Sequence, residues 1–247
     1  MSDVAPTVHP VRSMRHIVLR RDPRAPLVAI LYALCFASAL FLGRFALTTY
    51  DTLVGGIDAD TDPTPVTLSL GPVTVDVPRN MIRNQPFARG SVSELELRMH
   101  WPTMEGFSDL RAESFRNNDD RSTIIYATLR PFGGTLSPED RMRLVYSRLL
   151  DYPPSSGPGG LIGTPFASGH GYDGEILYTA GDPSHPFVAR CAPEDGGVPP
   201  SCIVEFRAGN GIDVIYRFRR HLLSRWKSID AAVRDTVASF MRDSSGG

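Results

Sequence analysis

The run APLVAILYALCFASALFLG, residues 25–43, divides the chain and determines its organisation. It contains no charged residue, and its apolar side chains would cover every face of a helix rather than one stripe. At about 1.5 Å per residue, a helix of this length covers most of the roughly 30 Å of hydrocarbon in a bilayer. We therefore predict a transmembrane signal-anchor helix over residues 25–47, in contact with the lipid bilayer.

The charges on either side of this run predict its orientation. Arginines precede it, at positions 12, 15, 20, 21 and 24, whereas Arg44 is followed by acids at positions 51, 58, 60 and 62. Positive charge stays on the cytoplasmic side of a membrane. Residues 1–24 are thus predicted to be a basic cytoplasmic tail, residues 48–65 an acidic linker, and residues 66–243 one domain outside the cytoplasm.

Cleavage of the apolar run is the alternative to anchoring. The triplet Ala37-Ser38-Ala39 has the small residues of a signal-peptidase site, but it lies inside the run and Leu-Phe-Leu follows it. These neighbours favour an uncleaved anchor. A mature chain that begins at residue 40 would contradict it.

Composition indicates both the source and the class of partner. The chain has 247 residues, 42% of them hydrophobic, and all of its basic residues except Lys227 are arginine. Such usage is typical of a GC-rich bacterial genome, which favours the bacterial inner membrane and a periplasmic domain. From residue 48 onward there are 20 basic and 25 acidic residues. This excess of acids argues against a nucleic-acid partner. For the same reason, the basic stretch Arg217, Arg219, Arg220, Arg225 is expected to be a solvated surface rather than a site for lipid headgroups or an anionic polymer.

Alternation of apolar and polar residues predicts a sheet. Apolar residues occupy every second position in 66–70 and in 73–77, across Gly71-Pro72, which predicts an opening hairpin. Further strands are predicted at 94–101, 122–130, 174–180, 186–191, 202–208 and 212–219. Most of the connections are short, as between antiparallel neighbours.

Two helices complete the domain. Ser137-Pro138-Glu139-Asp140 is a helix start, which predicts about 13 residues that end before Pro153. Apolar residues three and four apart predict a second helix from His221 to Met241. Strands and helices that do not alternate regularly predict an α+β fold with a mainly antiparallel sheet.

Two of the three cysteines, Cys191 and Cys202, lie in the segment assigned to the outside. Each borders a predicted strand, and the loop between them is polar and turn-forming. We predict a disulfide, because oxidising compartments preserve such bonds and no further zinc ligands lie near. Cys35 is expected to be an apolar residue of the anchor.

Catalytic and metal-binding patterns are weak. Ser168, His170 and Asp173 are residue types that a hydrolase uses, but they lie within six positions and no G-x-S-x-G motif surrounds Ser168. A glycine-rich turn ordered by these side chains is the preferred interpretation. The histidines show no ligand spacing, so we expect no cofactor and no metal site.

These patterns favour a membrane-anchored, non-enzymatic envelope protein whose outer domain binds a protein partner, either a membrane or a periplasmic protein. The alternative is an anchored periplasmic hydrolase of an envelope substrate, with Ser168 as its nucleophile.

Overall fold

The computed structural model describes residues 24–53, 60–83, 90–134, 136–181, 186–194 and 197–241. The chain forms two compact units, Met1–Val54 and Gly55–Gly247, each of which is described by itself. Most of the expected cytoplasmic tail, residues 1–23, lies outside the described residues.

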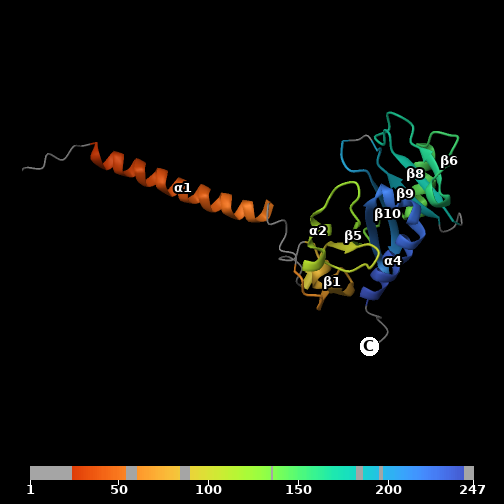
Figure 1. Cartoon of the computed structure of the whole chain (residues 1–247), viewed down its shortest axis with the longest axis horizontal. Helices are drawn as coiled ribbons and strands as arrows, with labels where there is room; N and C mark the ends of the chain where they lie inside the picture. The colour runs from red at the N-terminus through yellow and green to blue at the C-terminus, as the bar shows by residue number, and fades with distance from the viewer. Residues whose placement is uncertain are drawn as a thin grey trace, which may run out of the picture. The chain divides into compact units, whose positions relative to one another are not determined.

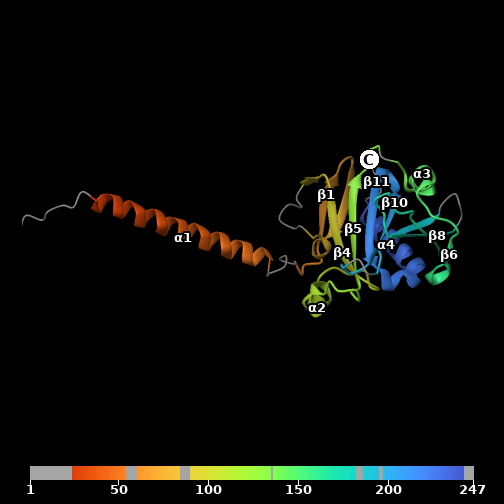
Figure 2. The same cartoon turned by 90° about the horizontal axis from the view of Figure 1, so that it is seen from above.

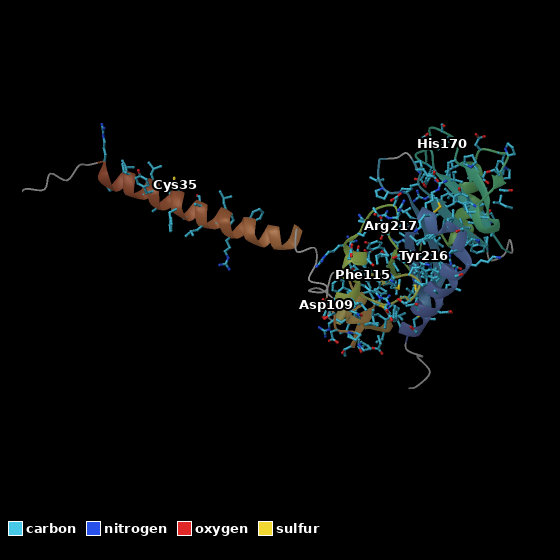
Figure 3. All side chains as sticks on the ribbon, in the orientation of Figure 1. Cys35, Asp109, Phe115, His170, Tyr216 and Arg217 are labelled. Carbon is cyan, nitrogen blue, oxygen red and sulfur yellow. A yellow bond between two sulfur atoms is a disulfide. The ribbon has the colours of Figure 1, made fainter. Side chains whose placement is uncertain are left out.

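The first unit contains the helix α1, Ala25–Leu53 (Figure 1). Its segment Pro26–Phe45 is long and apolar enough to cross a membrane, and the side chains whose burial is described there are exposed. Cys35, a free thiol, lies on this segment (Figure 3). The helix extends through residues 48–53, which the sequence assigned to the linker, and residues 54–59 lie outside the described part.

The second unit is an α+β domain, as predicted, built on two sheets. The strands of the smaller sheet lie in the order β2-β1-β3, and those of the larger one in the order β4-β5-β11-β10-β9-β8-β7-β6. Every described pairing is antiparallel except that of β1 with β3. The strands are β1 (Pro65–Leu70), β2 (Val73–Pro78), β3 (Gly90–Val92), β4 (Leu95–His100), β5 (Ile124–Pro131), β6 (Ser155–Ser156), β7 (Ile162–Pro165), β8 (Ile176–Ala180), β9 (Phe187–Cys191), β10 (Ser201–Ala208) and β11 (Ile212–Arg219).

The predicted opening hairpin is confirmed. β1 and β2 pair from Leu70 opposite Val73 to Pro65 opposite Pro78, and Gly71 makes the turn with a φ of 63°. A left-handed backbone suits glycine, since other residues have a Cβ that clashes there. A Cβ at this position would also approach the ring of Pro131 to 2.9 Å, so the glycine allows the hairpin to lie against β5.

One face of the large sheet carries the core, and we call it the covered face. Its buried side chains include Leu97, Leu129, Val214 and Tyr216, and they share one hydrophobic cluster with the inward residues of β1 and β2. The helix α4, Trp226–Phe240, closes this cluster with Ile229, Val233, Val237 and Phe240. Figure 2 shows α4 against β10 and β11, with β1 beside β4 and β5.

The described residues cover the opposite face, which we call the open face, at its two ends. At one end, the short helix α2 (Ala112–Arg116) places Phe115 with Phe107 over Ile124 of β5. At the other end, Tyr146 and Phe166 pack on Leu177 of β8. The strands between these two small clusters carry polar residues that are half-buried or exposed.

The predicted helix at Ser137 begins as expected but ends early. The Ser137 hydroxyl accepts the backbone N–H of Asp140, and α3 spans Pro138–Leu144 instead of about 13 residues. Val145 departs from helical geometry, with φ −112° and ψ −66°, and a 3₁₀ turn, Tyr146–Arg148, follows. This change of path buries the Tyr146 ring against Phe166, which a continuous helix would not do. The predicted C-terminal helix is confirmed as α4, preceded by a 3₁₀ segment, Arg220–Arg225.

Candidate binding site on the open face of the large sheet

A row of side chains crosses the open face at right angles to the strands. The register pairs Arg98 with Tyr126, Tyr126 with Arg217, Arg217 with Ile203, and Ile203 with Arg190. Directly paired residues on one face have Cβ atoms about 4.5–5.5 Å apart, so neighbours in this row contact each other. The row is therefore cationic and aromatic, in a domain whose sequence has an excess of acids.

Tyr126 lies at the centre of the arginines. The guanidinium carbon of Arg217 lies 5.3 Å from the centroid of its ring, and that of Arg83 lies 5.7 Å away. Both distances are within the range of cation–π attraction. Stacking of this kind limits the rotamers of an exposed arginine, and it leaves the N–H groups of the guanidinium to bind elsewhere.

A second row lies one step along the strands. Glu96 pairs with Thr128, Thr128 with Ile215, and Ile215 with Glu205. Glu96 lies 3.5 Å from the Arg83 guanidinium at one end, and Glu205 lies 2.9 Å from that of Arg141 at the other. The acids are thus neutralised at the edges, and the middle of the row is neutral.

The middle members of both rows line a groove of about 270 Å³ on this face, between the clusters that cover its two ends. Its lining includes Arg83, Glu96, Tyr126, Thr128, Ile215 and Arg217. Ile203 also lines it, and the same residue lines a smaller hollow of about 20 Å³ beside Tyr146 and Arg141. The groove therefore continues toward α3.

Arg98, at the start of the first row, is buried although it carries a charge. Only 5% of the residue is exposed, and its guanidinium carbon lies 5.5 Å from the ring centroids of both Phe107 and Phe115. Within the described part of the chain, its Nε and Nη2 atoms have no hydrogen-bond partner. Burial lowers the pKa of Arg98, because charge is disfavoured away from water.

The basic stretch at positions 217–225 is only partly solvated, which corrects the prediction. Arg217 and Arg219 do share the open face, and Arg217 is exposed. Arg219, however, is 9% exposed, because it donates to the backbone oxygens of Asn118 and Pro199. Arg220 likewise donates to the Ala192 oxygen and the Tyr178 hydroxyl. These two arginines form hydrogen bonds with segments distant in the sequence rather than extending into solvent.

The predicted disulfide between Cys191 and Cys202 is present. The two residues are directly paired on β9 and β10, in the middle of the large sheet, and both are fully buried on the covered face. The bond therefore joins neighbouring strands under the core, with Ile203 and Arg190 beside it on the open face.

The segment around Ser168 forms an ordered turn. Asp173 accepts the backbone N–H of Gly169 at 2.7 Å, and the side chains of Ser168 and His170 are exposed. No hydrogen bond links the three side chains in the described structure, and His170 lies at an edge of the domain (Figure 3). The arrangement orders the loop, as the glycine-rich interpretation predicts, and supplies no general base for Ser168.

Potential metal ligands are dispersed. Over the described ranges, no group of three or more His, Cys, Asp or Glu side chains is arranged to hold a metal ion. The nearest approach to a polar cluster joins His100 Nδ1 to Arg111 Nη1 at 2.9 Å, and Arg111 also pairs with Glu105. Burial and the neighbouring Arg111 lower the pKa of His100. His100 is thus a partner of arginine rather than a ligand.

Sequence reasoning missed the groove. Arg83, Arg98 and Tyr126 carry no local pattern that marks them, since they come from different elements. The available signal was the shared parity of Arg217 and Arg219 on one strand, which correctly indicated a common face.

Comparison of the sequence with protein-family models finds no match, and comparison with curated proteins finds no relative. Solved structures do resemble the fold. An immunity protein of the Stenotrophomonas maltophilia type IV secretion system is 18% identical, with 73% of this chain and 94% of that chain covered and a TM-score of 0.55. The iron-regulated outer membrane lipoprotein FrpD of Neisseria meningitidis is 14% identical, with coverage of 74% and 97% and a TM-score of 0.48. The likeness to the immunity protein shows that the α+β domain shares its fold.

Proposed function

We propose that the chain is a membrane-anchored, non-enzymatic bacterial envelope protein whose outer domain binds a protein partner through the open face of its large sheet. The observation that carries this proposal is the groove of about 270 Å³ over β4, β5, β11 and β10. A sheet face that is polar, hollowed and bounded by packed clusters has the form of a recognition surface, because arginine and tyrosine are enriched where proteins bind each other.

The location rests on two features that support each other. α1 carries an apolar segment long enough for a bilayer, and the domain after it contains a buried disulfide, a bond that oxidising compartments preserve. We propose that residues 25–47 anchor the chain in the inner membrane, with the N-terminus cytoplasmic and residues 66–243 periplasmic. The shared fold with an immunity protein of a secretion system is consistent with an envelope role.

Topology is tested by fusions to the full chain. Alkaline phosphatase attached at the C-terminus should be active and a cytoplasmic reporter at the same point inactive, because the arginines before α1 hold the N-terminus inside. The reverse pattern would overturn the orientation, and a mass that begins at residue 40 would replace the anchor by a cleaved signal.

Partner binding is tested by photocrosslinking from defined positions in living cells. A photoreactive amino acid at Thr128 should form an adduct with a protein, because Thr128 lines the groove. The matched control is the same amino acid at Asp235, an exposed position on α4. Adducts that form equally from both positions, or from neither, would contradict binding through the open face.

A further inference from the structure

Some arginines of the open face form no ion pair with a described carboxylate, although Asp119 and Asp120 attract the charge of Arg219. Carboxylates pair with Arg83, Arg141, Arg190 and Arg207. No ion pair with a described carboxylate is present for the other four arginines on this face, which are Arg98, Arg130, Arg217 and Arg219. The face therefore carries a local excess of positive charge, although the domain as a whole has more acids than bases.

Among these four arginines, Arg217 is the one that is placed to bind. Arg219 uses its donors on Asn118 and Pro199, Arg98 is buried beneath the phenylalanines, and Arg130 is not part of the groove lining. Arg217 is exposed, lines the groove and is held against the ring of Tyr126. An arginine that is already oriented loses little entropy when its planar fork of N–H groups donates to a carboxylate.

The surroundings of Arg217 specify more than charge. Ile203 is its paired neighbour on β10, and Ile215 lies two positions before it on the same face of β11. Both are half-buried and line the groove. Burial of a further apolar side chain on them would remove their remaining surface from water. Arg98, one step beyond Tyr126, adds a buried positive charge that an anion near the row would stabilise.

We infer that the groove receives an aspartate or glutamate of the protein partner, with its carboxylate on the Arg217 guanidinium and an adjacent apolar side chain on Ile203 and Ile215. This inference rests on the proposed function and adds the chemistry of the partner to it. The partner segment is therefore an acidic residue next to an aliphatic one.

The charges of the groove lining favour a protein carboxylate over a polyanion. Two arginines line the groove, and Arg217 is the one that forms no ion pair with a described carboxylate. A single carboxylate matches one guanidinium. A phosphate carries more charge than one guanidinium neutralises, and Arg83, the other arginine in the lining, already pairs with Glu96.

A peptide library tests the inference directly. Random peptides displayed on phage are selected on the full chain in detergent micelles, and selected sequences are resynthesised for binding measurements. We expect sequences with Asp or Glu beside Leu, Ile or Val. Arg217→Ala should weaken their binding at least about tenfold, and Arg217→Lys should weaken it less, because an ammonium keeps the charge but loses the bidentate geometry. Arg225→Ala, which removes an exposed arginine outside the groove, is the matched control.

Several outcomes would overturn the inference. The inference is wrong if the selected peptides lack Asp and Glu, if Arg217→Ala leaves their binding unchanged, or if no selection depends on Arg217. Stronger Arg217-dependent binding to phosphatidylglycerol vesicles or to inorganic phosphate than to the peptides would replace the carboxylate by a phosphate. Adducts from Thr128 that persist in the Arg217→Ala chain would leave the proposed function standing while the carboxylate site fails. A melting temperature unchanged by each substitution shows that the domain remains folded.

Discussion

The two faces of the large sheet are made by the same strands and have opposite chemistry. On β11, Val214 and Tyr216 are fully buried on the covered face, whereas Ile215 and Arg217 lie on the open face. The covered face packs against a second sheet and α4, while the described residues pack on the open face at its ends. The contrast indicates that one face supplies the stability of the domain and the other is free to serve binding.

The charges show the same division. The buried polar contact of the covered face, Tyr216 with Asp230, is complete, since the hydroxyl donates to the carboxylate at 2.8 Å. On the open face, Arg98 is buried with two nitrogen atoms that have no partner in the described structure. Burial of a charge whose hydrogen bonds are incomplete destabilises a fold, so Arg98 lowers the stability of the domain rather than adding to it. The following substitutions test this division.

Truncation of Leu129 should have the largest effect. Leu129 is fully buried on the covered face of β5, and Leu129→Ala should lower the free energy of unfolding by about 2–5 kcal/mol because it leaves a cavity. Thr128→Ala, at the next position and on the open face, should change it by less than about 1 kcal/mol. Urea unfolding of both chains measures the difference. Equal losses would show that the open face also supports the fold.

Removal of the disulfide should have the next largest effect. Cys191→Ser should cost about 2–4 kcal/mol, because the bond restricts the unfolded chain and lies under the core. For a domain of this size, the melting temperature should fall by about 2–4 °C for each kcal/mol. Cys35→Ser, in the other unit, is the control and should leave the melting temperature of the domain unchanged. Alkylation of both Cys191 and Cys202 without reductant would contradict the bond.

Loss of the Tyr216 hydroxyl should have a smaller effect that depends on pH. Burial and the Asp230 carboxylate raise the pKa of Tyr216 well above its usual 10.0. Above pH 10 the unfolded chain releases this proton while the folded chain retains it, so stability is complete below that pH and falls as pH rises toward the folded pKa. Tyr216→Phe should cost about 1.5–3 kcal/mol at neutral pH, because a hydrogen bond to a charged group is lost.

The same substitution should flatten the alkaline limb of the stability curve. Between about pH 9 and pH 11, the unfolding free energy of both chains should fall as pH rises. The fall should be steeper in the unsubstituted chain than in Tyr216→Phe, by up to about 1.4 kcal/mol per pH unit. Lys227 and the other tyrosines titrate in the same range in both chains, so the difference between the two slopes isolates Tyr216. Burial also raises the pKa of Tyr146, which leaves some slope in both chains. Identical slopes would contradict the assignment.

The sequence predicted the covered face better than the open one, for a physical reason. Alternation marks a strand wherever one side is apolar, and the hairpin at 66–77 and the strands β10 and β11 were found in this way. The short strands β6 and β7 were missed because Ser155–Ser156 and Ile162–Pro165 are too short and too rich in glycine and proline to alternate.

Long-range contacts explain the other misses. Arg219 resembled a solvated arginine because its partner Asn118 lies 101 positions away in the chain. The groove depends on the registers of β4, β5, β11 and β10, which set the rows of polar residues and which no local pattern fixes. The predicted disulfide succeeded because both cysteines border strands that form a hairpin, so a local pattern was sufficient there.

Replacement of Arg98 should have the smallest effect on stability and separates the two faces most directly. Arg98→Met keeps an unbranched apolar side chain that can pack on Phe107 and Phe115, and it removes a charge that burial disfavours. Exchange of an incompletely satisfied buried charge for an apolar side chain is often neutral or stabilising by about 1–4 kcal/mol. Unfolding free energy should therefore stay the same or rise, in contrast to the loss expected for Leu129→Ala.

The partner adduct from Thr128 should respond in the opposite sense. If Arg98 contributes positive charge to the row that binds the partner, Arg98→Met should reduce the yield of the adduct while the domain melts at the same or a higher temperature. Arg130→Met, which removes an open-face arginine outside the first row, is the control and should keep the yield. A marked loss of stability in Arg98→Met would instead show that this arginine stabilises the fold. The division between a stabilising face and a binding face would then not hold for Arg98.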